Sequence, residues 1–448
     1  MVKKEGLNMS LGKTIRWMMA IVCVILVFVS SAFVSQGATE KTVYLRDGGN
    51  GDGSSYERAI GDFKSAVRLL ADSGGRIVIC GKYTFNRLIA LSEQSGTANG
   101  NRTITVTSVD GDKDYRITDN AALCVGDNET SANIVLAGNF VFEKMNIITN
   151  GSETPRAIIC GGNKTVFGEG IICKKIGNAP HISVVGITLS DSVDKSGKIT
   201  IESGTYNYVC AGNRNGIHKG DTTLTINGGT FEGFVSVSGI EDEKNIQNGD
   251  AELTINGGSF LNSVGALTEV SGELSVVING GTFRKSIVAL GRKNVIDING
   301  GTLQNVEVIR VGVSDAADTD DNDKNNNKNY SSTVNINNYT GDVDKLVSKI
   351  QGTDVKINIK TEGGSDIETN QNPPTTTPSG DDEPLTTTPE DVEENDKTVP
   401  EKEARTYLLG NKENTVVACV ALGGVVFLAV IALVYRLIHE KNNKEPNK

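Results

Sequence analysis

The sequence predicts an all-β fold, a parallel β-helix solenoid, from a recurring block and from the register inside it. The block reads x-Ile-Asn-Gly-Gly-Thr-Phe, and a second short β-like run follows each copy. Repeats of about 20 to 50 residues are typical of solenoids, propellers and arrays, because one unit cannot bury its apolar face without stacked neighbours. The copies occupy residues 224–231, 253–260, 276–283 and 296–303.

The first half of each block predicts a strand with one buried face. The residues one and three places before the asparagine share a side of the strand, because side chains alternate between its two faces. The residues between them point outward. The inward positions are Ile226, Ile255, Ile278 and Ile298, with Leu224, Leu253, Val276 and Ile296, and the outward positions are Thr225, Thr254, Val277 and Asp297.

The Gly-Gly pair predicts a tight turn after each strand, since glycine enters positive φ without a steric cost. The turn directs the last residue of each block inward, which gives one apolar column of Phe231, Phe260, Phe283 and Leu303. An earlier unit at residues 199–206 and a degenerate one at residues 334–339 extend the same register in both directions.

Two architectures compete for this pattern. In a parallel β-helix successive coils stack at about 4.8 Å, so equal positions form ladders of Ile, Phe and Asn. A β-sandwich also contains many short strands, but its alternating antiparallel strands do not require the same turn residue at the same offset in every unit. The repeat therefore favours the β-helix.

Segments before the repeats carry a resemblance to a known family. Residues 43–55 are similar to a first strand and loop, residues 62–71 to a capping helix, and residues 74–81 and 136–147 to coils. With the repeats, they resemble the right-handed parallel β-helix proteins of the pectate-lyase-like superfamily, and more closely the secreted β-helix surface proteins of Gram-positive anaerobes. The resemblance implies a right-handed β-helix with an N-terminal capping helix over residues 40–363.

The two ends of the chain predict export and a membrane anchor. Residues 1–38 combine basic residues, an apolar run and small residues, which is the pattern of a signal peptide or signal anchor. Residues 415–435 hold no charge and predict a transmembrane helix, and the basic tail at 436–448 is expected in the cytoplasm. Residues 364–405 hold six of the nine prolines and predict a disordered, acidic stalk.

Five cysteines lie in the predicted exported part, and an odd number cannot pair completely. Several end apolar runs, where a free thiol behaves as a small buried hydrophobe. Stacked thiols in the core are therefore the first interpretation, with disulfides between coils as the alternative. No spacing matches a zinc site. The five are Cys80, Cys124, Cys160, Cys173 and Cys210.

The sequence assigns no catalytic, cofactor-binding or metal-binding residue and no cofactor. His181 and His218 have no serine or cysteine motif beside them. The outward column after the blocks is chemically mixed, and the repeat columns show no acidic ladder. The loop at 318–323 lacks features of a calcium loop, and residues 48–52 predict a turn. The outward column consists of Glu232, Leu261, Arg284 and Gln304.

These observations predict a membrane-anchored extracellular β-helix protein that binds a polysaccharide or a surface protein. A polysaccharide lyase or glycosidase of the pectate-lyase-like superfamily is the alternative, and a structural surface coat protein is a further one. A net charge of −11 without a basic patch argues against nucleic acid as a partner. The predicted exported part contains no Trp, which weakens sugar binding by a stacking platform. The expected location is the cell membrane, with a single span after signal cleavage.

Overall fold

The computed structural model describes residues 40–371 with gaps. It omits residues 86–88, 91–101, 127–131, 152, 189–193, 215, 241–245, 313–330, 338, 340, 353–354 and 361–365. The predicted signal segment, most of the predicted stalk, the predicted membrane span and the tail lie outside the described residues. Within the described residues, no helix is long and apolar enough to cross a membrane.

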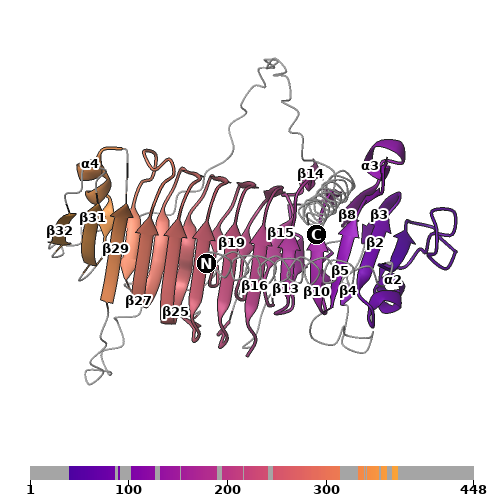
Figure 1. The fold of residues 1–448 in the computed structure, drawn as a ribbon, viewed down its shortest axis with the longest axis horizontal. Coiled ribbons are helices and arrows are strands. Elements are labelled where there is room, and N and C mark those ends of the chain that lie inside the picture. The colour runs from indigo at the N-terminus through magenta and orange to yellow at the C-terminus, as the bar shows by residue number, and fades with distance from the viewer. Residues whose placement is uncertain are drawn as a thin grey trace, which may run out of the picture. The chain divides into compact units, whose positions relative to one another are not determined.

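The described chain is an all-β solenoid of stacked parallel strands, as the repeat predicts (Figure 1). Three columns of strands run along it, and each coil from β2 to β26 contributes one strand to each column. The first column contains β1 (Thr42–Leu45), β2 (Gly75–Ile79), β5 (Thr103–Thr107), β10 (Asn139–Phe142), β13 (Lys164–Phe167), β16 (Gly197–Ile201), β19 (Thr222–Ile226), β23 (Ala251–Ile255), the ends of β25 (Val264–Ile278) and β27 (Ile287–Ile298), β29 (Ser331–Asn337) and β31 (Val355–Lys360).

The second column contains β3 (Lys82–Phe85), β8 (Ala122–Val125), β11 (Asn146–Gly151) and β14 (Ile172–Gly177), followed by a separate sheet of β17 (Thr205–Tyr206), β20 (Thr230–Phe231), β24 (Ser259–Phe260) and β26 (Thr282–Phe283). The third column contains β4 (Ile89–Ala90), β9 (Ile134–Val135), β12 (Ala157–Ile159), β15 (Ser183–Val185), β18 (Val209–Cys210), β21 (Val235–Ser236), the starts of β25 and β27, β28 (Ile309–Gly312) and β30 (Ile350–Gln351). All pairings within the columns are parallel.

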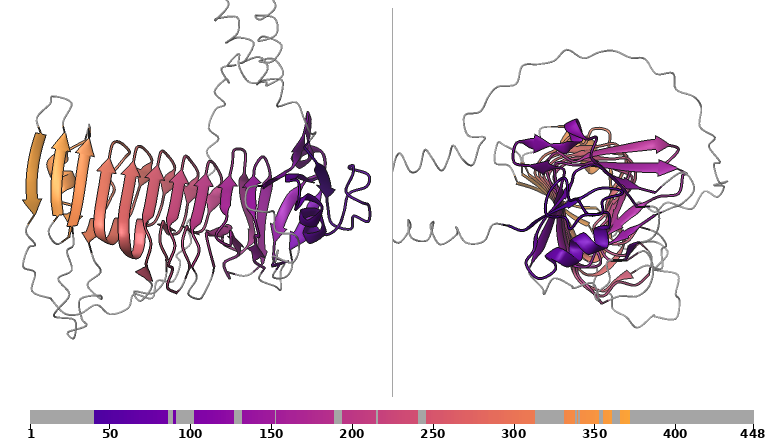
Figure 2. Two further views of the ribbon diagram at one scale, coloured as in Figure 1. Left: turned by 60° about the horizontal axis from the view of Figure 1, so that its bottom comes forward. Right: turned by 90° about the vertical axis from the view of Figure 1, so that its right-hand side faces the viewer.

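The remaining elements lie at the ends and corners of the stack. The helix α2 (Phe63–Leu70) contacts β1 and β2, and Asp62 caps it by accepting a hydrogen bond from the Ser65 N–H at 2.9 Å. Its apolar face is buried, and it lies across the end of the stack in the right panel of Figure 2. Shorter elements are β6 (Val109–Asp110), β7 (Lys113–Asp114), α3 (Tyr115–Thr118), β22 (Ile246–Gln247) and α4 (Val343–Val347).

The last strand, β32 (Asp366–Gln371), pairs antiparallel with β31. Strand pairing therefore continues beyond residue 363, where the sequence placed the end of the β-helix and the start of the stalk. An antiparallel strand covers the edge that the final coil would otherwise present, and an exposed edge is a template for unwanted pairing.

The core has the predicted register. Leu224 pairs with Leu253 and Ile226 pairs with Ile255, and the corresponding residues of β25, β27 and β29 continue both columns. Phe231, Phe260 and Phe283 stack with ring centroids 4.9 Å apart at each step. The predicted apolar columns are confirmed, and Leu303 is buried at the end of the phenylalanine column.

The asparagines of the repeat form a hydrogen-bonded ladder on the surface. The side-chain amide of each asparagine donates to the side-chain oxygen of the equivalent residue in the preceding coil, at 2.7 to 2.9 Å. The first amide donates to the Glu202 carboxylate at 2.8 Å. The predicted asparagine ladder is confirmed, and it consists of Asn227, Asn256, Asn279, Asn299 and Asn337.

All five predicted exported cysteines are free thiols in the structure, and Cys80, Cys160 and Cys210 are buried. The interpretation as core thiols is therefore preferred over disulfides between coils. Burial raises the pKa of Cys160 to about 12, since the thiolate would lose its solvation. Cys210 lies between Val185 and Ser236 in strand register, and Cys124 lies between Thr84 and Ile148, so neither stacks on another thiol.

Candidate functional site

The solenoid changes its cross-section where the second column breaks into two sheets. The strands β11 and β14 have six residues each, whereas β17 and β20 have two. The connection from the second to the third column spans residues 152–156 in the coil of β11 and residues 178–182 in the coil of β14. In the next coil it spans only residues 207–208. Among the described strands, β14 pairs with β11 on one edge and with none on the other. The two long strands therefore overhang the coils that follow, and we call this feature the ledge (Figure 2).

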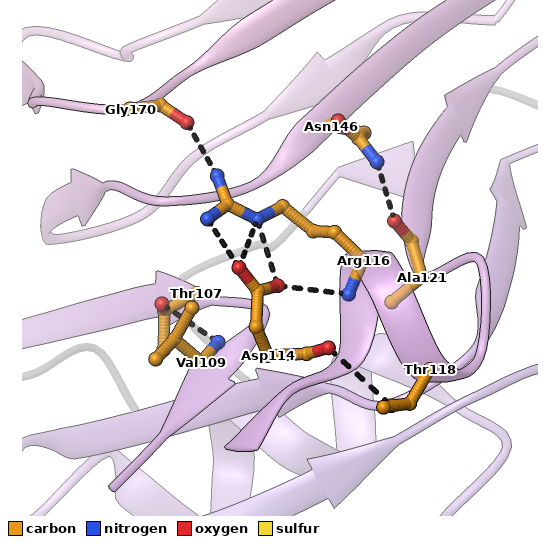
Figure 3. A network of polar contacts seen from close by, with 8 residues as sticks. All are labelled: Thr107, Val109, Asp114, Arg116, Thr118, Ala121, Asn146 and Gly170. Carbon is orange, nitrogen blue, oxygen red and sulfur yellow. Dashed lines mark hydrogen bonds and ion pairs between the residues drawn. The ribbon is translucent and has the colours of Figure 1, made fainter. Parts of the chain in front are cut away.

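Polar contacts hold the ledge in place. The Thr149 hydroxyl, buried on β11, donates to the Pro180 carbonyl at 2.6 Å and so fixes the loop that follows β14. Arg116 makes a bidentate ion pair with Asp114, the shortest distance being 2.6 Å, and donates to the Gly170 carbonyl at 2.9 Å (Figure 3). This network fastens α3 to the chain just before β14.

A shallow cleft lies at the end of the ledge. Its volume is about 530 Å³, and two neighbouring coils line it. Gly151, Glu153 and Thr154 come from the coil of β11, and Gly177 and Asn178 come from the coil of β14. The lining offers a carboxylate, a hydroxyl, an amide and two residues without side chains, so a polar ligand can approach the backbone closely.

A charged group lies beside the ledge and joins distant parts of the sequence. His181, in the loop after β14, contacts the Glu232 carboxylate through its Nδ1 at 2.9 Å. Lys175 of β14 lies 3.9 Å from the same carboxylate. The Glu232 side chain is 35% exposed and the His181 side chain 11% exposed. The carboxylate orients the ring through Nδ1.

The outer face of the third column carries a second, smaller apolar cluster that includes the buried Tyr208, and one exposed aromatic residue, Phe234. Val184, Val209 and Val235 point into the main core, so the alternation places Ser183, Tyr208 and Phe234 on the outer face. The Arg214 guanidinium lies 5.5 Å from the centre of the Tyr208 ring. Phe234, one coil further, is 42% exposed.

The sequence assigned no site residue, but the structure brings together some of the residues that it considered and separates others. Glu232 and His181 meet at the ledge, whereas Arg284 lies two coils further along the outward column. The loop at 318–323 is outside the described residues. Asp52, in the predicted turn at 48–52, makes an ion pair with Arg58 at 2.7 Å. In the part of the chain that the structure describes, no group of three potential ligands could hold a metal ion.

An acidic ladder lies just before the repeated blocks. Asp221, Asp250 and Glu273 form it, because they precede residues that pair in register. Each of the first two carboxylates accepts a backbone N–H from the next coil, at 2.9 and 2.8 Å. The sequence alignment missed this ladder because it followed the positions within the block, and these acids come before it.

His218 is buried away from the ledge and is not part of it. Its Nε2 contacts the Lys195 carbonyl, and the Gly220 N–H lies 3.3 Å from the same atom. Burial lowers the pKa of His218 by disfavouring the charged ring, and the Lys195 carbonyl opposes this effect. The residue is a structural histidine in this arrangement.

We expect His218 to make the fold less stable in mild acid. Because the pKa is lower in the folded state than its unfolded value of about 6.5, the unfolded chain takes up the proton first as the pH falls. The contribution of His218 is therefore fully present above that value and is lost as the pH falls toward the folded pKa. Chemical unfolding at pH 7.5 and pH 5 should show a larger loss for the wild type than for His218→Asn. Equal losses would contradict the assignment.

Comparisons with family models, curated proteins and solved structures give no match for this chain. The class of protein is therefore defined by its own architecture, a parallel β solenoid that carries an irregular ledge on one side.

Two residues of the site escape detection from the sequence. Phe234 lies three places after Phe231, outside the repeated block, and Asn178 lies in a connection without a motif. The signal that could have found them is the spacing of the repeats. The segment between the second and third columns is long in the coils of β8, β11 and β14 and short afterwards. An interruption of a regular solenoid marks where side chains gather.

Proposed function

We propose that this chain is a secreted, membrane-anchored surface protein whose solenoid binds a glycan at the ledge. The anchor and the export signal rest on the sequence of residues 1–38 and 415–435. We also propose that the solenoid is a right-handed β-helix of the pectate-lyase-like type. Right-handed crossovers between parallel strands are the general rule, which supports this hand.

The exposed aromatic ring beside hydrogen-bonding groups is the observation that carries the proposal. A sugar presents an apolar C–H face and a rim of hydroxyl groups, so it needs an apolar surface and polar partners within reach. Phe234 supplies the first, and the residue is 42% exposed on the outer face. Glu232 lies two residues before Phe234 in the chain and contacts His181 at 2.9 Å, so these residues supply a carboxylate and an imidazole. A phenylalanine outside the repeat thus offsets the lack of Trp in the predicted exported part.

The carboxylate–histidine pair gives a specific reason to keep a glycan-cleaving enzyme as the second candidate. A histidine oriented by a carboxylate at 2.9 Å can take or donate a proton through its other nitrogen. Cleavage of a glycan would be detected as an increase in reducing ends or in the ultraviolet absorbance of unsaturated products. Product that forms with the wild type and not with Glu232→Gln would favour the enzyme over the binding protein.

We expect Phe234→Ala to weaken glycan binding by tenfold or more, which corresponds to about 1.4 kcal/mol. Binding of the full-length chain in detergent would be measured on a panel of neutral and acidic polysaccharides. Val295→Ala is the matched control, because Val295 is also 42% exposed and lies on a strand of the first column. Equal binding by the two variants would contradict the proposal, as would the absence of binding to any polysaccharide.

A further inference from the structure

We propose that the asparagine ladder protects four Asn-Gly sequences of this chain against deamidation. Deamidation converts the side-chain amide into a carboxylate, and asparagine is one of the thermolabile residues of proteins. A following glycine favours the reaction, because a residue without a side chain leaves its backbone nitrogen unobstructed. The protected sequences begin at Asn227, Asn256, Asn279 and Asn299.

The reaction starts at the backbone nitrogen of the glycine. This nitrogen loses its proton and attacks the side-chain Cγ of the preceding asparagine, which closes a five-membered imide ring. The bond from Cγ to the amide nitrogen breaks, and ammonia leaves with the proton. Water then opens the ring and gives aspartate or isoaspartate. Solvent is the only other reactant, and all four asparagines are exposed to it.

The glycine nitrogens are not what holds this reaction back. Among the described residues, the N–H groups of Gly228, Gly257 and Gly300 donate no hydrogen bond. The Gly280 N–H does donate to the Ile255 carbonyl, but only at 3.3 Å. Protection must therefore come from the asparagine that is attacked.

Each of the four asparagines is held through its side chain and its backbone. The side-chain amide donates to the preceding rung, and the side-chain oxygen accepts from the following rung, at 2.7 to 2.9 Å. The backbone N–H donates to an isoleucine carbonyl of the preceding coil at 2.7 or 2.8 Å. Attack requires the side chain to turn toward the glycine nitrogen, which breaks both side-chain hydrogen bonds. The loss of two such bonds slows the reaction by roughly tenfold or more.

Both ends of the ladder are residues that no glycine follows. Glu202 precedes Ser203 and accepts from the Asn227 amide at 2.8 Å. At the other end, Asn337 precedes Asn338 and donates to the side-chain oxygen of Asn299 at 2.8 Å. The four Asn-Gly sequences are therefore interior rungs, and each has a partner on both sides.

An Asn-Gly sequence outside the ladder provides the comparison within the same molecule. Asn248 is exposed and precedes Gly249. Its side-chain oxygen accepts from the Ser271 hydroxyl at 3.1 Å, but its side-chain amide donates to no described residue. Asn248 is thus held on one side only.

The test is peptide mass spectrometry of the full-length protein in detergent, with the deamidation rate measured at each site in mildly alkaline buffer. In the native wild type, Asn248 should react roughly tenfold or more faster than any of the four ladder sites, and unfolding in urea should remove the difference. Glu202→Ala should raise the rate at Asn227 and leave Asn299 unchanged. Asn337→Ala should raise the rate at Asn299 and leave Asn227 unchanged.

A conservative variant and the thermal midpoints separate the ladder from a general loosening of the fold. Glu202→Gln keeps an oxygen acceptor for Asn227 and should protect it as the wild type does. If Glu202→Ala melts early, Asn337→Ala at the other end makes the same comparison. Ladder sites that react as fast as Asn248 in the native wild type would overturn the proposal. So would equal rises at Asn227 and Asn299 in a variant whose thermal midpoint is that of the wild type.

Discussion

Replacement of Phe260 by alanine is expected to lower the free energy of unfolding by about 3 to 5 kcal/mol, the cost of a large cavity in a core. The ring is fully buried and stacks between Phe231 and Phe283, at 4.9 Å from each centroid. Its removal leaves both neighbours without a packing partner on one side. Denaturant unfolding followed by circular dichroism would measure the loss.

Thr254→Ala is the matched control in the same coil. Thr254 lies on the outer face of β23, between the buried Leu253 and Ile255, so its truncation should cost well under about 1 kcal/mol. Each coil of a solenoid contacts mainly its neighbours, so hydrogen exchange should place the loss from Phe260→Ala in the adjoining coils. Similar losses for the two variants would mean that the strand register is wrong.

Gly265→Ala is expected to destabilise the protein by about 3 kcal/mol or more, through a clash that the backbone must relieve. Gly265 has a φ of +141°, and a Cβ built on it would lie 1.8 Å from the Val288 carbonyl oxygen in the next coil. That oxygen belongs to the β25–β27 ladder, so it cannot move without disturbing strand pairing. The midpoint of denaturant unfolding would report the effect.

A second glycine separates the clash from the backbone strain. Gly111 has a φ of +56°, and a Cβ at that position would meet no atom within 4 Å. Gly111→Ala therefore carries only the penalty of a left-handed conformation, about 1 to 2 kcal/mol. A loss at Gly265 no larger than that at Gly111 would show that neighbouring coils can shift apart.

The regular part of the fold could be predicted because neighbours in the stack are equal positions in the repeat. Ile226 pairs with Ile255 and Phe231 pairs with Phe260, because each pair occupies the same position in successive copies of the repeat. The side-chain amide of Asn279 donates a hydrogen bond to the side-chain oxygen of Asn256 at 2.8 Å for the same reason. In such a solenoid an alignment of repeats is already a list of contacts.

The site could not be predicted in the same way. Glu232 belongs to an outward column that reads as chemically mixed, and its partner His181 is 51 residues away in a coil without the repeat. The column offered no reason to pair them. The acidic ladder of Asp221, Asp250 and Glu273 was missed for a related cause, since it precedes the aligned block.

The sequence by itself determined the parallel stack, its buried Ile and Phe columns and its surface asparagine ladder. These follow from local alternation and from repetition, and both are visible in the order of residues. Only the tertiary structure decided where the ledge lies and which side chains meet there. The overhang depends on how far β11 and β14 extend before the chain turns, and the pairing of His181 with Glu232 depends on the tight corner of the coil between them. Such irregular connections carry no repeated pattern, so their side chains acquire neighbours only when the coils are stacked.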